Sequence, residues 1–267
     1  SGGAVYLSQG ETASLVLAAL GHDVLHTGVN NSFLIQTNHP YYQELGEHSL
    51  QETRSANYVL TLLDKHHILT IEDGMSEDLR KEILEARNLV EQSILWTDIK
   101  RHKEQIEAVA SAKESILSIL HKQREDPAQE GIVGARKKDL NNGVNISDLL
   151  DFKTRSLMAS FILHCADISN PGKDWVKCER WAVLVMNEFF SQGDLQKKLG
   201  LKPSMNCDRS TVSVPGCQVG FGKYVIHDLY VLLKETIHDG GGYLLENFIS
   251  NQEKWKSLQA IVEETGA

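Results

Sequence analysis

The sequence has no apolar run long enough to cross a membrane and no targeting segment at its start. Its longest apolar stretches, such as residues 15–20, are far shorter than the roughly 20 residues that a membrane-spanning helix needs. The first residues, Ser1, Gly2 and Gly3, lack the basic start and the apolar segment of a signal peptide. We therefore expect no transmembrane segment, and we interpret the start as a cut boundary.

Positive charge and paired cysteines are also scarce. The formal net charge is −9, which argues against sequence-independent binding to nucleic acid, although bound cations can still make one pocket attractive to a small anion. The four cysteines form no Cys-x-x-Cys pair, and in a chain of 267 residues they are typical of reduced, buried thiols. The sequence thus predicts a cytoplasmic protein that binds no nucleic acid.

What the sequence has instead is helical periodicity. In residues 76–95 the apolar positions that would share one helix face are Leu79, Ile83, Ala86, Val90 and Ile94. Similar patterns occur in residues 106–120, 149–166, 181–190, 224–233 and 243–262, and the five prolines lie between such segments. We predict a single all-α domain of about ten helices over residues 1–267. Residues 123–145 are polar and aperiodic, which indicates an exposed loop within it.

A histidine and an aspartate stand side by side near the start of the chain. His22 offers a neutral nitrogen ligand and Asp23 an anionic oxygen ligand, a pair suited to zinc or another divalent metal. His26 follows four residues after His22, so a continuing helix would place both imidazoles on one face. Taken alone, such a His-Asp pair is more often an ordinary surface pair than a metal site.

A second polar group follows an apolar helical segment. His164 and Asp167 come at the end of this segment, where we expect both side chains to enter the interior. A buried, ionised aspartate is costly unless it is paired or bound to a metal. The alternative is that Asp167 and Ser169 only cap and turn the chain before Pro171.

Two further segments have a structural as well as a functional interpretation. Thr97 and Asp98 precede His102, and an ordinary Asp98–His102 pair within a helix is the simpler interpretation. Glu52 is a candidate for holding metal-bound water. Residues 49–52, Ser-Leu-Gln-Glu, also fit a capping box that opens a helix over residues 52–66.

A glutamine and a phenylalanine stand three residues apart in the segment Gln-Val-Gly-Phe, residues 218–221. The Gln218 amide has one acceptor and two donors, so it can read the edge of a purine. Phe221, one helical turn away, could stack on the face of the base, although in isolation it is more simply a core residue. The two residues are therefore a candidate base-binding element.

Taken in order, these segments resemble the catalytic domain of the class I cyclic-nucleotide phosphodiesterases, over roughly residues 11–262. His-Asp-x-x-His-x-Gly-x-x-Asn occupies residues 22–31, and Thr-Asp-x-x-x-His occupies residues 97–102. His-x-Ala-Asp-Ile-Ser-Asn-Pro occupies residues 164–171, and Gln-Val-Gly-Phe completes the series. The block between them includes Trp181, Val185, Met186, Glu188, Phe189, Phe190 and Gln-Gly-Asp at 192–194. The ordered set is far more specific than any one of its motifs.

The resemblance implies a compact, HD-domain-like helical fold and hydrolysis of a 3′,5′-cyclic nucleotide to the 5′-monophosphate by a two-metal mechanism. It implies that His22, Asp23 and Asp167 bind Zn²⁺, with the two aspartates as the catalytic carboxylates. Asp23 would also bridge to a second ion, Mg²⁺ or Mn²⁺. The water shell of that second ion would be held by His26, Glu52 and Thr97.

The resemblance also implies how the small-molecule substrate is bound. Gln218 would bond the purine edge, while Phe221 and Val185 would cover its two faces. Asn170 stands where adenine-selective members of the family carry an asparagine, which favours cyclic AMP. Because the Gln218 amide can rotate, cyclic GMP stays open as a substrate. Regulatory domains can lie outside this chain.

The sequence departs from the family pattern at three places. The upstream His-Asn-x-x-His motif, which supplies a zinc ligand and the general acid, is absent, so we expect a fragment that lacks the first helices and is nearly inactive by itself. Residues 52–55 are Glu-Thr-Arg-Ser instead of Glu-Asn-His-His, and Asn206 replaces a pocket methionine. Two alternatives stay open: a catalytically silent cyclic-nucleotide-binding module, and an HD-type hydrolase of other nucleotides.

Overall fold

The computed structural model describes residues 6–124 and 149–265, and every regular element in these two ranges is a helix. The elements of the first range are α1 (Gln9–Gly21), α2 (Asn31–Gln36), α3 (Pro40–Leu45), α4 (Leu50–Lys65), α5 (Glu77–Leu95), η2 (Ile99–Arg101) and α6 (His102–Arg124). Those of the second are α8 (Phe152–Asp167), η4 (Asn170–Gly172), α9 (Trp175–Lys198), α10 (Val214–Phe221), η5 (Gly222–Ile226), α11 (His227–Thr236) and α12 (His238–Thr265). The predicted all-α class is confirmed.

Two of the predictions concern segments rather than the fold class. The loop predicted at residues 123–145 lies outside the described residues, except for its first two positions, which end α6. The helix predicted over residues 76–95 is confirmed as α5, and Ser76 caps it by accepting a hydrogen bond from the Leu79 N–H. Ile83, Val90 and Ile94 are buried as expected, whereas Leu79 is 42% exposed, so the buried face begins one turn later.

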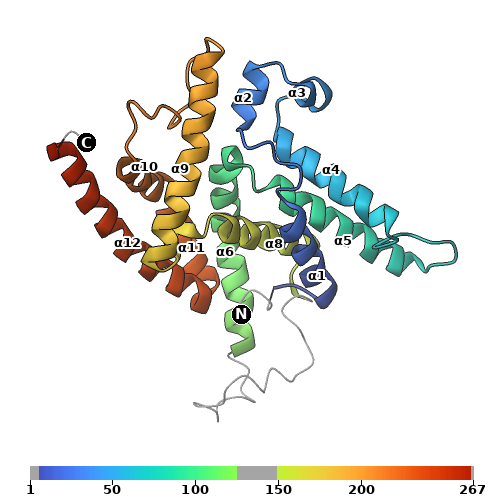
Figure 1. Cartoon of the computed structure of the whole chain (residues 1–267). Helices are drawn as coiled ribbons and strands as arrows, with labels where there is room; N and C mark the ends of the chain where they lie inside the picture. Colours follow the sequence, from blue (N-terminus) through green and yellow to red (C-terminus); the bar gives the residue numbers. More distant parts are fainter. Residues whose placement is uncertain (1–5, 125–148, 266–267) are drawn as a thin grey trace.

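Helix α8 lies at the centre of the molecule, with α1 and α5 on one side and α11 and α12 on the other (Figure 1). Phe161 of α8 and Tyr230 of α11 are completely buried in the main apolar core. A second apolar cluster joins α1, α4 and α5 through Ala18, Val59 and Val90. Because α8 is packed on both sides, the residue at its end, Asp167, is held in a fixed place. No helix in the described ranges is long and apolar enough to span a membrane.

A partly buried ion pair links the first turns of α1 and α8. Glu11, in the first turn of α1, lies 2.7 Å from Arg155, in the first turn of α8. Glu11 also closes a capping box with Ser8 at the start of α1, so its carboxylate is held by two elements. His22 lies eleven residues after Glu11, and Asp167 lies twelve after Arg155. At about 1.5 Å per residue, both helices rise by nearly the same length from the ion pair to their C-terminal ends.

Candidate functional site

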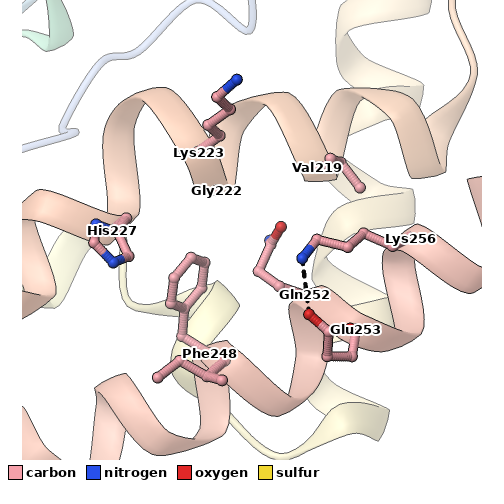
Figure 2. Close-up of a pocket in the computed structure, with 9 residues that line it drawn as sticks. Val219, Gly222, Lys223, His227, Phe248, Gln252, Glu253 and Lys256 are labelled. Atoms are coloured by element: carbon pink, nitrogen blue, oxygen red, sulfur yellow. Dashed lines mark hydrogen bonds and ion pairs between the residues drawn. The ribbon is translucent and has the colours of Figure 1, made fainter.

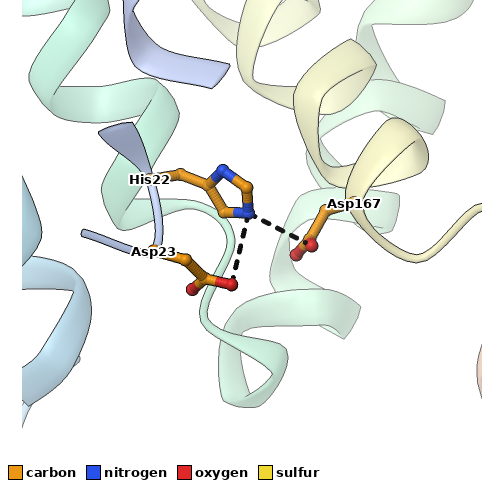
Figure 3. Close-up of side chains that lie close together, drawn as sticks. All are labelled: His22, Asp23 and Asp167. Carbon is orange, nitrogen blue, oxygen red and sulfur yellow. Dashed lines mark hydrogen bonds and ion pairs between the residues drawn. The ribbon is translucent and has the colours of Figure 1, made fainter. Parts of the chain in front are cut away.

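The C-terminal ends of α1 and α8 bring three potential metal ligands together (Figure 3). His22 Nε2 lies 3.3 Å from Asp167 Oδ1 and 3.6 Å from Asp23 Oδ2, and the three ligand atoms all lie within 4.8 Å of one another. Two ligands that are each about 2.0–2.2 Å from one ion can be at most about 4.4 Å apart. The two histidine–carboxylate distances therefore fit a shared divalent ion.

The orientation of the His22 ring suits metal binding. Nδ1 lies 2.9 Å from the Ala19 carbonyl oxygen, which can only accept, so Nδ1 carries a proton and donates it. Nε2 then faces the two carboxylates. A ligand histidine commonly has its second nitrogen bonded to a carbonyl or carboxylate, which fixes its tautomer.

The charges around His22 also favour a cation at this site. The hydrogen bond to Asp167 is the main cause that raises the pKa of His22 to about 9, while partial burial opposes the rise. Each helix end adds a partial negative charge to the two carboxylates. In the chain without metal, a proton on Nε2 supplies the positive charge, and a bound metal ion would replace that proton. The donor set of one imidazole and two carboxylates thus fits a divalent metal.

His26 does not join this cluster. The Gly21 backbone packs directly on α4, since a Cβ at Gly21 would lie 2.3 Å from Val59 Cγ2, and the chain turns away after α1. Leu25 has a left-handed φ of 66°, so the helix cannot continue to His26. The prediction that a continuing helix places both imidazoles on one face is therefore wrong. His26 Nδ1 instead accepts a hydrogen bond from the Gly28 N–H.

Glu52 lies in a polar group separate from the three potential metal ligands. Its Oε2 accepts a hydrogen bond from Asn31 Nδ2 at 2.9 Å. Burial is the main cause that raises the pKa of Glu52, and the nearby Asp98 carboxylate raises it further. The capping-box alternative for residues 49–52 is wrong, because Ser49 has a left-handed φ of 43° and donates its hydroxyl to Asp98 at 2.8 Å.

Asp98 does not form the expected pair with His102 within a helix. Asp98 caps η2 by accepting from the Lys100 N–H, and no hydrogen bond joins it to His102 in the described structure. His102 Nδ1 instead lies 2.9 Å from Nε2 of His164. The Asp98–His102 pair was therefore a wrong expectation. The side-chain partner of Asp98, Ser49, is 49 positions away, and the partner of His102 is 62 positions away, so local spacing does not reveal these contacts.

Of the two polar residues at the end of α8, His164 lies in the interior and Asp167 faces the potential metal ligands. His164 is completely buried, as expected, and burial is the main cause that lowers its pKa to about 4. Asp167 is only half-buried and pairs with His22. Ser169 makes no side-chain cap, so the alternative in which both Asp167 and Ser169 only turn the chain does not describe the structure.

A cavity of about 290 Å³ adjoins the ion cluster. Asp167 and Thr97 line one part of it, and all four candidate substrate-binding residues line it as well: Val185 from α9, Asn170 from η4, and Gln218 and Phe221 from α10. Asp167 therefore belongs both to the metal-ligand cluster and to the cavity wall. Phe221 also packs against the main core, so the core and base-binding interpretations of this residue are compatible.

Three side-chain amides line the cavity without a hydrogen-bond partner among the described residues: Asn170, Asn206 and Gln218. The backbone near two of them is held firmly. Asn251 Nδ2 donates to the Pro171 carbonyl, next to Asn170, and Gln252 Nε2 donates to the Gln218 carbonyl at 3.2 Å. The free amides are thus positioned by backbone contacts while their own donors and acceptors stay available to a ligand.

The sequence did not identify all of the cavity-lining residues. Ile99 and Phe189 line the cavity, and nothing in their local pattern marks them as such. Asn206 carried a signal, because it departs from the family's methionine, but it was not among the predicted substrate-binding residues. It has a left-handed φ of 65° in a turn closed by the hydrogen bond from the Cys207 N–H to the Ser204 carbonyl.

Comparisons with curated proteins identify relatives of the chain. It is 30% identical over 247 residues to the 3',5'-cyclic-AMP phosphodiesterase 4C of Rattus norvegicus, and 27% identical over 247 residues to "Probable 3',5'-cyclic-AMP phosphodiesterase pde-4" of Caenorhabditis elegans. Both alignments cover 92% of this chain. The chain spans only 41% of the first relative and 33% of the second.

The fold and the family follow from two further comparisons. The phosphodiesterase domain of the RhoPDE fusion protein from the choanoflagellate Salpingoeca rosetta matches with a TM-score of 0.75 at 20% identity, over 97% of this chain and 72% of that one. At this identity the likeness shows the fold alone. The family model described as 3'5'-cyclic nucleotide phosphodiesterase matches residues 2–247. The chain therefore belongs to the 3'5'-cyclic nucleotide phosphodiesterase family.

Proposed function

We propose that this domain hydrolyses a 3′,5′-cyclic nucleotide, with cyclic AMP as the favoured substrate, to the nucleoside 5′-monophosphate. Family membership and the names of the two relatives support the reaction class. The observation that carries the proposal is the position of Asp167, which is shared by the metal-ligand cluster and the adjoining cavity. A substrate with its base in the cavity would have its phosphate near the ligands.

We assign His22, Asp23 and Asp167 as the residues that would hold Zn²⁺, and Asp23 also as a residue that would hold Mg²⁺ or Mn²⁺ at a second site. When bound, two such ions activate water and neutralise charge that develops on the phosphate. His22 contributes Nε2 because the Ala19 carbonyl holds its Nδ1 proton. Asp23, with its side chain 68% exposed, is free to face two ions.

Three further polar residues would order water for the second ion. We assign this role to His26, Glu52 and Thr97. Glu52 Oε2 accepts from Asn31, and a carboxylate has further lone pairs that can accept from water. Thr97 donates its hydroxyl to the Ile94 carbonyl and lines the cavity beside Asp167, so its oxygen can still accept from water.

The adjoining cavity would bind the purine. Gln218 offers donors and an acceptor to the base edge, and Asn170 adds a second amide that we propose favours adenine. Phe221 and Val185 come from different helices and would cover the two faces of the base. Aromatic stacking on a base contributes about 1–3 kcal/mol in other proteins.

Product analysis with the full-length natural protein tests this function. We expect cyclic AMP to be converted to 5′-AMP only when divalent metal is present, and Asp167→Ala to abolish the conversion. Asp194→Ala is the matched control, because Asp194 is an exposed carboxylate that pairs with Arg209 outside the cluster. A full-length protein that binds metal and cyclic AMP but forms no 5′-AMP is a silent binding module, and the proposed hydrolysis is then wrong.

A further inference from the structure

A second cavity lies against another side of the helix that carries Gln218 and Phe221. It has a volume of about 340 Å³ and lies between the α10–α11 segment and α12 (Figure 2). Gln218 and Phe221 line the first cavity, whereas Val219 and Gly222 line the second. The two cavities therefore share one helical segment but have different walls. Ligand pockets commonly enclose about 300–1,000 Å³, so the second cavity suits a small ligand.

The close approach of two helices shapes this cavity. A Cβ on Gly222 would lie 2.2 Å from Gln252 Nε2, so only glycine allows the Gln252 amide to enter at this point. Gln252 Nε2 donates to the Gln218 carbonyl at 3.2 Å. Residues Gly222–Ile226 form a π-helix, η5, a rare geometry that occurs often at functional sites. The Gln252 amide therefore forms a fixed polar wall of the cavity.

One side of the cavity is apolar. Phe248 and Ile249 line it from α12, and Val219 lines it from α10. Phe248 is nearly completely buried, while Ile249 is 52% exposed. The apolar surface thus extends from a buried floor to an exposed edge, and it can hold the apolar body of a ligand.

The other side of the cavity carries a cation with spare hydrogen-bond donors. Lys256 Nζ lies 2.8 Å from Glu253, which is the one carboxylate among the described lining residues. An ammonium group has three donors, and this bond uses one of them. Figure 2 shows the Lys256 ammonium reaching toward the Gln252 amide. Lys223 also lines the cavity, but its side chain points away from the Gln252 amide (Figure 2), and its ammonium lies 5.0 Å from the centre of the Tyr224 ring. Lys256 is therefore the cation that faces the Gln252 amide.

We propose that this cavity binds a small carboxylate with an apolar body. The carboxylate lies at the Lys256 ammonium, within reach of the remaining Gln252 amide proton, and the body lies on Phe248 and Ile249. A charge-assisted hydrogen bond then fixes one end of the ligand, and apolar burial holds the other. The site needs no metal and no hydrolysis, so it stands independently of the proposed function.

Calorimetric titration of the 267-residue chain with 4-phenylbutyrate tests the proposal, with the neutral amide of the same acid as the matched ligand. We expect a dissociation constant of about 0.1–1 mM for the acid and at least about threefold weaker binding of the amide. Lys256→Gln should remove this difference. Lys254→Gln should preserve it, because the Lys254 ammonium lies over the Trp175 ring and lines no part of the cavity.

Methyl NMR shifts locate the bound acid. We expect the acid to move the signals of Ile249 and Val219, and Ile249→Trp to block binding by filling the exposed edge of the cavity. Equal affinity for the acid and the amide overturns the proposal. So does the absence of saturable binding below about 10 mM, or a set of shifted methyl groups that excludes both residues. The wild-type affinities for the acid and the amide, together with the wild-type methyl shifts, test the proposal even if one variant fails to fold.

Discussion

His22 Nε2 lies 3.3 Å from Asp167 Oδ1, although 145 positions separate the two residues in the chain. The contact joins the ends of α1 and α8, whose first turns are linked by the Glu11–Arg155 ion pair. The candidate metal site is thus built by two helices that start in register and end together. Its chemistry depends on their packing as much as on the ligands themselves.

We expect Asp167→Ala to abolish retention of a divalent metal ion. The variant removes one of two carboxylates that face His22 Nε2, so the remaining ligands are too few to compete with water. Metal analysis after dialysis should show metal in the wild-type chain and none in the variant. Asp194→Ala should retain metal as the wild type does, because Asp194 is bonded to Arg209 outside the cluster. Equal metal content in the Asp167 and Asp194 variants would exclude Asp167 as a ligand.

Metal binding should release close to one proton at pH 7.5. The pKa of His22 is raised from 6.5 to about 9, so Nε2 holds a proton that the metal must displace. Apparent metal affinity should therefore rise with pH by up to about tenfold per unit and level off near pH 9. Titration calorimetry in buffers of different ionisation enthalpy measures the released proton. A pH-independent affinity without proton release would contradict the assigned ligand.

The raised pKa of His22 also affects the stability of the metal-free chain, which should fall as the pH rises. Because the folded-state pKa of His22 is raised, the stability that its pair with Asp167 contributes is fully present below pH 6.5. It is lost as the pH rises through about 9. With a chelator present, the melting temperature of the chain should fall as the pH rises through about 9. This pH dependence should be smaller in the His22→Gln variant.

Phe221→Ala should weaken cyclic AMP binding by about 1–3 kcal/mol. The variant should also melt at a lower temperature, because Phe221 packs against the main core as well as lining the cavity. Phe152→Ala is the matched control, since Phe152 packs against the same core and lines no part of the cavity. We expect lower melting temperatures in both variants but weaker binding only in Phe221→Ala. Unchanged binding in Phe221→Ala would make this residue a core residue only.

The 267-residue chain should hydrolyse cyclic AMP very slowly even with metal supplied. It contains no His-Asn-x-x-His motif, and therefore no residue that matches the family's general acid. General acid–base catalysis contributes about 10²–10⁴-fold to a rate. Comparing the turnover number of the chain with that of the rat cyclic-AMP phosphodiesterase 4C measures this loss. Equal turnover numbers would show that another residue of the chain protonates the leaving oxygen.

Local patterns predicted the helices better than their ends. The α5 helix follows from its Ser76 cap and its apolar spacing, both of which act within a few residues. The turn after α1 depends on the contact between Gly21 and Val59 of α4. Ser49 donates its hydroxyl to Asp98 instead of capping α4. Such contacts join residues far apart in sequence, so helical spacing alone cannot reveal them.

The candidate site was accessible from the sequence mainly through the family resemblance. His22, Asp23 and Asp167 were grouped by ordered motifs, and no spacing rule joins residues that lie on different helices. Gln218 and Phe221 share a cavity as their spacing of three suggested. The Gln252 contact that holds the Gln218 backbone could not be predicted, because it crosses from α12 to α10.

The central claim is that the ion cluster and the adjoining cavity form one binding site, joined at Asp167. The most direct test is the affinity of the chain for cyclic AMP and for adenosine, each measured with and without Zn²⁺. Zn²⁺ should tighten cyclic AMP binding by about tenfold or more, which corresponds to 1.4 kcal/mol, because the phosphate then meets the metal. Adenosine has no phosphate, so its affinity should stay unchanged. Equal affinities for cyclic AMP with and without Zn²⁺, in a chain that retains the metal, would contradict the account.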